Sequence, residues 1–282
     1  MVGRMFRTIF WNMLAIVRLR YVIFTLAFFL FLGFVSAREA SERAVLDTGS
    51  DRTTVWDALF VAFAGPGLRD TSLVRMLGWF LPHLIVCAMV GDKVWRDLSQ
   101  HNPVFVVRVG LRLHWWLAQV ISVVLATIAY TVLAMAVVLT IAGSTLEWSH
   151  PFDTSLVVTE ALERPLYANA ANITLWMTLL LMTTFCTFTI WQTTLSLITR
   201  LPTVITGALA LILAFSWILG IDRKSLVPWL PGSQSMILRH DLFAPDVAGF
   251  SLVWSLVYNG IAILAAVFIG LFYTINMDFL GE

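Results

Sequence analysis

Residues 115–143 read WWLAQVISVVLATIAYTVLAMAVVLTIAG, and this stretch contains no Asp, Glu, Lys or Arg. At about 1.5 Å of rise per helical residue, such a run can cross a hydrocarbon core of about 30 Å. Five further stretches without a charged residue in their interiors lie at about 21–36, 76–91, 173–198, 203–221 and 252–275. The sequence therefore predicts an all-α integral membrane protein with six transmembrane helices.

The overall composition supports this fold class. Of the 282 residues, 59% are hydrophobic and 12% are charged, and the mean hydropathy is +0.86. Soluble domains carry roughly 25% charged residues. The longest connection between predicted spans, residues 37–75, leaves no room for a separate soluble catalytic domain. The net charge of +1, without a basic patch that contains aromatic residues, gives no indication of nucleic-acid binding.

No catalytic or metal site can be placed from the sequence. Cys87 and Cys186 both fall inside predicted spans, where no His or Cys lies at a spacing that favours a metal. The chain has no Gly-rich phosphate loop of the Walker type, so we do not expect it to hydrolyse ATP. The histidines outside the spans are scattered over both sides of the predicted topology: His101, His114, His150 and His240. We expect neither an enzyme nor a cofactor in this chain.

His83 is the one side chain inside the predicted spans that titrates near neutral pH. Ion-driven transporters generally hold an ionisable group in the membrane to couple movement to a gradient. Because no carboxylate, lysine or arginine lies within the spans, we expect a membrane pathway whose energy comes from elsewhere. Pro82 predicts a kink beside His83, since proline removes a backbone donor. His83 then either bonds a nearby carbonyl or faces a cavity.

Residues 1–20 form a predicted amphipathic helix in the membrane interface. At 100° per residue, its basic face carries Arg4, Arg7, Trp11 and Arg18. Phe6, Ile9, Phe10, Met13 and Val17 lie across from this face. Such a helix is suited to anionic lipid, and it is either a simple anchor or a connecting helix that touches a cytoplasmic partner. Arg18 and Arg20, directly before the first span, favour a cytoplasmic N-terminus, and six spans then place both termini inside the cell.

Two outside loops contain apolar segments. Thr54–Phe63 is a mostly apolar run that is followed by Gly65-Pro66-Gly67, so we expect a short helix lying on or dipping into the outer surface. Residues 228–232 read PWLPG, and two prolines and a glycine around a tryptophan predict a broken or re-entrant segment at the interface.

The largest internal loop on the inside is Gly91–His114. Its charged residues include Asp92, Lys93, Arg96, Asp97, Arg108 and Arg112. Arg96 and Asp97 could pair across an interface, because the arginine fork forms directional hydrogen bonds. Residues 105–114 alternate like a strand, but a lone strand has no backbone partner, so we expect an extended segment or a short helix. The alternative is a solvated basic loop without a partner.

Several motifs carry a resemblance to a known family. They are Asp57–Phe60 (DALF), Gly65–Gly67 (GPG), Gly91–Leu98 (GDKVWRDL), Val107–Arg112 (VRVGLR) and Trp115–Gln119 (WWLAQ). With the layout of the spans, they resemble bacterial ABC-2-type permeases, the transmembrane subunits of ATP-binding-cassette exporters. Gln119 departs from the pattern, in which a Lys follows the tryptophan pair. The resemblance implies six spans, cytoplasmic termini, an N-terminal interface helix and a coupling element between the second and third spans.

The resemblance also implies partners and sites. It implies a multi-pass protein of the cell membrane that pairs with a second six-span permease and with separate ATPase subunits, which hold ATP and Mg. The implied region of contact with the ATPase contains Lys93, Arg96, Asp97, Arg108 and Arg112. The family lines its substrate path with the second and fifth spans, which adds Phe215, Ser216 and Trp217 to His83.

Threonines in the fourth span leave a further choice open. Thr183, Thr187 and Thr194 share one helical face, which fits either helix–helix packing or a mildly polar wall of a substrate path. The expected substrate is amphipathic: a peptide antibiotic, a drug or a lipid. Two other functions stay open, a membrane scaffold or sensor that transports nothing and an integral membrane enzyme that acts on lipid.

Overall fold

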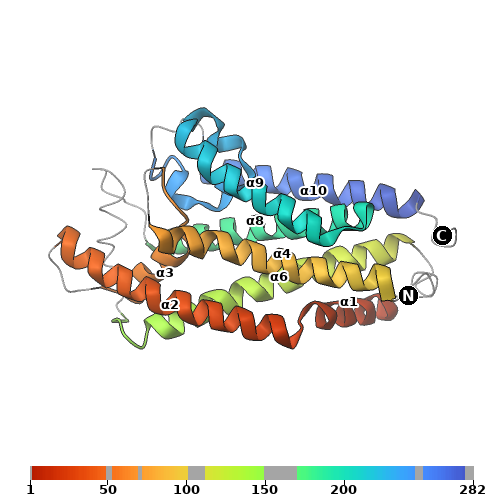
Figure 1. The fold of residues 1–282 in the computed structure, drawn as a ribbon, viewed down its shortest axis with the longest axis horizontal. Coiled ribbons are helices and arrows are strands. Elements are labelled where there is room, and N and C mark those ends of the chain that lie inside the picture. Colours follow the sequence, from red (N-terminus) through yellow and green to blue (C-terminus); the bar gives the residue numbers. More distant parts are fainter. Residues whose placement is uncertain are drawn as a thin grey trace.

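The structure, a computed structural model, describes residues 2–48, 53–68, 72–100, 112–148, 170–244 and 250–276. In these ranges the chain consists of helices joined by turns and short irregular segments, without a strand. Figure 1 shows one elongated bundle of long helices, with the first helix and the end of the last helix at the same end. We call this the terminal end, and the opposite end the distal end.

Six long helices form the bundle. They are α2 (Leu19–Thr48), α4 (Leu73–Gln100), α6 (Arg112–Ala142), α8 (Ala170–Thr199), α9 (Pro202–Asp222) and α10 (Leu252–Asn276). Each contains a segment that is long and apolar enough to cross a membrane, which confirms the predicted fold class. The ends of α6, α8, α9 and α10 fall within three residues of the predicted spans.

Helix α2 extends past the predicted span 21–36, so the start of the predicted first loop is helical instead. Two ion pairs between residues one turn apart stabilise the extension. Arg38 Nε lies 2.7 Å from Glu42 Oε1, and Arg43 Nη2 lies 2.6 Å from Glu39 Oε1. Charged residues end an apolar run, but when they pair along the helix they do not end the helix.

The predicted coupling loop Gly91–His114 is helical at both of its ends. Helix α4 continues to Gln100, and α6 begins at Arg112. Residues 101–111 lie outside the described residues, and with them most of the strand-like alternation that the sequence shows. The helix of the second span therefore extends beyond the span at the terminal end, without a break.

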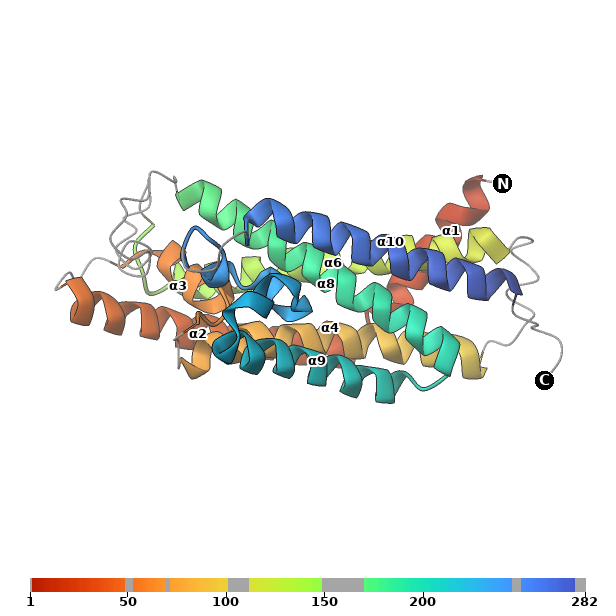
Figure 2. The ribbon, with the colours of Figure 1, turned by 90° about the horizontal axis from the view of Figure 1, so that it is seen from above.

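The predicted interface helix is α1 (Val2–Ile16), which is shorter than residues 1–20. The helix breaks before Arg18, whose carbonyl accepts hydrogen bonds from the N–H groups of Tyr21 and Val22, both at 3.0 Å. Arg18 thus begins the turn into α2 and does not belong to the face on which the sequence placed it. Figure 2 shows α1 crossing the bundle rather than continuing α2.

Helix α1 buries one face in the bundle and exposes a second, aromatic face, where the sequence predicts a single apolar face. The face that packs against α6 carries Thr8, Ile9, Asn12 and Ile16, all buried. There Ser122 Oγ of α6 donates to the carbonyl of Ile9 at 3.3 Å. Phe6 and Phe10 are exposed on a second face that is suited to lipid. The prediction grouped Ile9 with these phenylalanines, but packing on α6 separates them.

Short elements close the distal end. Helix α3 (Val55–Phe63) begins with a capping box, in which Asp57 Oδ2 accepts from the N–H and the hydroxyl of Thr54 at 3.0 and 2.9 Å. All residues of α3 except Trp56 are buried, so the expected short helix dips into the bundle. Three 3-10 helices follow α9: η1 (Lys224–Trp229), η2 (Pro231–Ser235) and η3 (Ile237–Arg239). They correspond to the broken segment that the sequence predicts.

Helix α8 lies at the centre of the bundle. In its most apolar window 61% of the residues are buried, against 22% in α9 and 17% in α10. Aromatic rings connect α8 to two other helices: Phe185 lies 5.7 Å from Tyr130 of α6 and 4.4 Å from His83 of α4, measured between ring centroids. Helices α9 and α10 lie on the flanks and present most of their apolar surface to the surroundings.

Candidate functional site

The terminal end exposes several of the predicted basic residues. Arg7 and Trp11 lie exposed on α1, between the buried face and the face of Phe6 and Phe10. The side chain of Arg4 lies outside the described part of the chain. Arg112 is exposed at the start of α6, and its Nη1 donates to the carbonyl of Ile275 at 2.5 Å. This contact stabilises the last turn of α10, where backbone carbonyls lack helical partners.

Lys93, predicted on the coupling surface, points into the bundle. Its side chain is 1% exposed, and Nζ donates to Oε1 of Gln119 in α6. In this structure Lys93 therefore connects α4 to α6 and is not presented to a partner. Arg96 and Asp97 lie in the last turns of α4 with side chains outside the description, and Arg108 lies in the range 101–111 that the structure does not describe.

His83 bonds a carbonyl, one of the two alternatives that the sequence leaves open. Its Nδ1 lies 2.6 Å from the carbonyl oxygen of Trp79, and the side chain is completely buried. Phe185 and Phe188 of α8 pack edge-on against the imidazole ring. The hydroxyl of Tyr130 donates to the Pro82 carbonyl at 3.1 Å, so α6 binds α4 at the proline. His83 belongs to the packed interior between α4 and α8.

The threonine face of α8 packs on α10. Asn259, about two turns into α10, donates from Nδ2 to Thr184 Oγ1 at 3.0 Å and to Thr183 Oγ1 at 3.4 Å, and its Oδ1 accepts from Thr187 at 3.0 Å. Thr194 donates to the carbonyl of Ala266 at 3.1 Å. The sequence analysis did not single out Asn259, although a lone amide in an apolar span is a signal for such contacts.

The three candidates in α9 lie in different surroundings. Phe215 is 55% exposed on the flank of the bundle. Ser216 is buried, and its Oγ accepts from the N–H of Gly232 in η2 at 3.1 Å. Trp217 is half-buried and packs against the apolar cluster between α4 and α9. Of the three, only Phe215 presents its side chain to the outside.

The distal end is covered by a structure that we call the distal cap, defined as residues 55–68 and 231–244. Its two halves come from the first and third distal connections and meet where Phe60 lies 5.8 Å from Phe243, between ring centroids. Gly65, at φ +74°, packs directly against Met236, which suits glycine and would strain other residues. Trp79 of α4 donates from Nε1 to Ser235 Oγ at 2.9 Å, which fixes the cap on the bundle. Figures 1 and 2 show the cap lying among the distal parts of α4, α8 and α9.

Arg239 lies at the centre of the distal cap. Its Nε donates to the carbonyl of Pro66 at 3.2 Å, Nη1 to the carbonyl of Ser216 at 3.0 Å and to Ser233 Oγ at 3.3 Å, and Nη2 to the carbonyl of Trp217 at 3.2 Å. No acidic side chain among the described residues pairs with it. Burial lowers the pKa of Arg239 to about 10, so the guanidinium stays charged at neutral pH.

His240 connects the same segment to α10. Its Nδ1 lies 3.0 Å from the carbonyl of Met236, and its Nε2 lies 2.8 Å from Ser255 Oγ. The Gln234 side chain bonds to Ser255 at 2.8 Å, and the imidazole stacks on Phe250 with ring centroids 4.2 Å apart. Burial lowers the pKa of His240 to about 4, against the opposing effect of hydrogen bonds with the Met236 and Ile237 backbone. The sequence analysis did not place Arg239 or His240 in any site.

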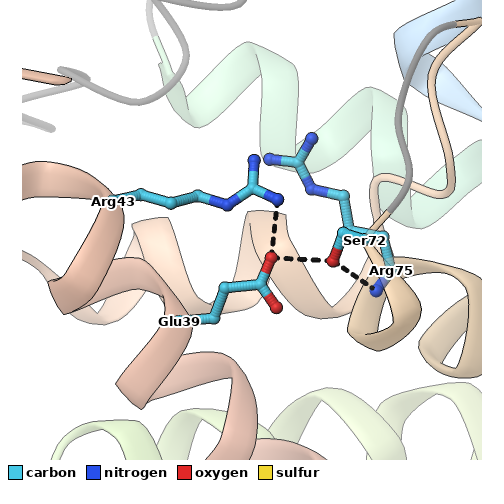
Figure 3. A network of polar contacts seen from close by, with 4 residues as sticks. All are labelled: Glu39, Arg43, Ser72 and Arg75. Carbon is cyan, nitrogen blue, oxygen red and sulfur yellow. Dashed lines mark hydrogen bonds and ion pairs between the residues drawn. The ribbon is translucent and has the colours of Figure 1, made fainter. Parts of the chain in front are cut away.

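Figure 3 shows how the extension of α2 is fixed beside the cap. Glu39 Oε1 accepts from Arg43 at 2.6 Å and from the hydroxyl of Ser72 at 2.7 Å. Ser72 Oγ in turn accepts from the N–H of Arg75 at 3.3 Å and so caps α4. The Arg75 side chain is buried, with its guanidinium carbon 5.9 Å from the ring centroid of Phe60 in α3. The start of α4 thereby contacts both α2 and the cap.

Over the described ranges, no group of three or more His, Cys, Asp or Glu side chains is placed to hold a metal ion. A scan against protein-family models and a search of curated proteins found no match to the chain. The described residues form a bundle of apolar helices with a packed cap at one end and, at the other, an amphipathic helix that buries one face on α6.

Proposed function

We propose that the chain is the membrane-spanning permease subunit of an ATP-driven exporter for an amphipathic substrate. In this proposal it works with separate ATPase subunits and a second six-span permease in the cell membrane, with both termini cytoplasmic. The observation that carries the proposal is the asymmetry of the bundle. The distal end carries a packed cap beside the extension of α2, whereas the terminal end presents the amphipathic helix α1 and the extension of α4.

The helical extension of α4 supports this function because it can act as a lever. Nine residues follow Gly91 before the helix ends, which corresponds to about 14 Å of helix beyond the predicted span. A partner that contacts this extension moves the second span directly, since no break separates the two. Interfaces that drive rigid-body rocking of domains need such stiff connections.

Contacts at the terminal end distribute the movement. Lys93 of α4 bonds Gln119 of α6, and one turn further along α6 Ser122 bonds the backbone of α1 at Ile9. Helices α1, α4 and α6 therefore move together when the extension is pushed. Arg7 and Arg112 remain exposed on these helices as contacts for a partner or for anionic lipid.

The proposal is tested by purifying the tagged protein from its native membrane in mild detergent and identifying the proteins that co-purify. We expect an ATP-binding-cassette subunit in stoichiometric amount. The double substitution Arg96→Glu and Arg108→Glu should remove it, because both residues fall in the proposed contact region. Arg223→Glu is the matched control, since Arg223 is an exposed arginine at the distal end.

Two results would contradict the proposal. Recovery of the chain without any ATPase would favour a scaffold or a lipid-modifying enzyme. A complex with an ATPase that shows no ATP-dependent movement of amphipathic probes across reconstituted vesicles would exclude export as its function.

A further inference from the structure

Arg239 joins its own segment of the cap to two parts of the molecule that lie elsewhere in the sequence, the loop at Pro66 and the end of α9. Through Pro66 it holds the first half of the distal cap, through Ser233 the second half, and through the carbonyls of Ser216 and Trp217 the distal turns of α9. Gly220 makes this position possible, because a Cβ at residue 220 would overlap Nη1 of Arg239.

The acceptors of Arg239 differ in whether they would still be hydrogen-bonded after the guanidinium has left. The carbonyls of Ser216 and Trp217 lie inside α9, where they already accept hydrogen bonds from residues four positions ahead. Withdrawal of the guanidinium therefore leaves these acceptors satisfied. The guanidinium itself is buried among neutral dipoles, since none of the described carboxylates pairs with it, and it would regain full hydration outside the cap.

The neighbouring residue indicates how the cap would move. His240 bonds Ser255 of α10, and this contact does not involve Arg239 or α9. For the 3-10 segment to stay attached to α10 and separate from α9 and from Pro66, the bonds of Gly232 to Ser216 and of Ser235 to Trp79 have to break as well. Arg239 thus connects the cap to α9, and the adjacent His240 connects it to α10.

We propose that Arg239 is a releasable latch, which holds the two halves of the distal cap on α9 and whose withdrawal lets the cap open about its attachment to α10. The latch is a property of the chain alone. In the proposed exporter, a substrate path that opens outward has to break the contacts of Arg239. This consequence rests on the proposed function.

The test is hydrogen–deuterium exchange of the purified chain in detergent, read out by mass spectrometry. We expect Arg239→Gln to raise the exchange of residues 64–68 and 231–239 together, by tenfold or more. Exchange in the middle of α4 and in the first turns of α10 should stay unchanged. Gly220→Ala should have the same effect, because its Cβ displaces the guanidinium without removing the charge. Arg223→Gln is the control for loss of an exposed arginine nearby.

Faster exchange of residues 231–239 alone, with 64–68 unchanged, would overturn the proposal, since the two halves would then not be joined by Arg239. Faster exchange throughout α4, α6 and α8 would also overturn it, because Arg239 would then stabilise the whole fold. If Arg239→Gln cannot be purified, Gly220→Ala decides between the same outcomes. No ATPase or substrate is needed, so a failed transport assay and a failed exchange experiment are distinguishable.

Discussion

Acidification should weaken the distal cap through His240. Burial lowers the pKa of this imidazole to about 4, from an ordinary value of 6.5 in the unfolded chain. The folded protein therefore favours the neutral ring, and the resulting stabilisation is complete above pH 6.5 and is lost as the pH falls toward 4. Between pH 8 and pH 5, proton uptake by the unfolded state should lower the free energy of unfolding by about 2 kcal/mol.

Thermal unfolding in detergent, followed by tryptophan fluorescence, measures this effect. A loss of about 2 kcal/mol corresponds to a fall in Tm of roughly 4–8 °C for a chain of around this size. His240→Gln removes the titrating group and keeps an amide that can bond Ser255, so its Tm should change less between pH 8 and pH 5. The charged neighbours that could interfere are Arg239, which points toward α9, and Asp241, which is exposed. Equal falls in Tm for the native protein and the variant would refute the reasoning.

Two further predictions concern the packing of α10. Gly270→Ala should destabilise the protein by about 1–3 kcal/mol, because a Cβ there overlaps the Trp116 ring and disturbs its hydrogen bond to the Val267 carbonyl. Gly260→Ala is the control, since no atom lies within 4 Å of a Cβ at that position, and its Tm should not fall. Asn259→Ala should cost about 1 kcal/mol, less than its contacts suggest, because the hydroxyls of Thr183 and Thr187 have acceptors on their own helix. Thermal unfolding tests both predictions, and a greater loss for Gly260→Ala than for Gly270→Ala would contradict the first.

The positions of the spans could be predicted because crossing a hydrocarbon core excludes charge over a fixed length. The ends of α2 and α4 could not be predicted in the same way. The ion pair Arg38–Glu42 lies in α2 beyond the point where the apolar run stops. Hydropathy alone does not predict this extension, because it takes no account of ion pairs between residues one turn apart. The short helix α3 was expected from its apolar run, but only the structure shows that it is buried in the bundle.

The burial of Lys93 had a signal that the sequence analysis did not use. Val86, Met89, Val90 and Lys93 follow one another at helical spacing, and all four are buried. If α4 is extended past Gly91, this pattern places Lys93 on the inner face. Arg239 gave no such signal, because its carbonyl partners come from two other segments, at Pro66 and in α9, whose approach depends on the tertiary structure.

The central position of α8 has a consequence for how the protein is made. Helix α8 contains the fourth of the six spans to leave the ribosome, yet it supplies the partners of groups on earlier helices. Thr127 of α6 bonds Thr189, and the rings of His83 and Tyr130 pack on Phe185. Until α8 inserts, these groups of the first three spans lack their partners, so the packed interior of the bundle forms only after the fourth span has been made.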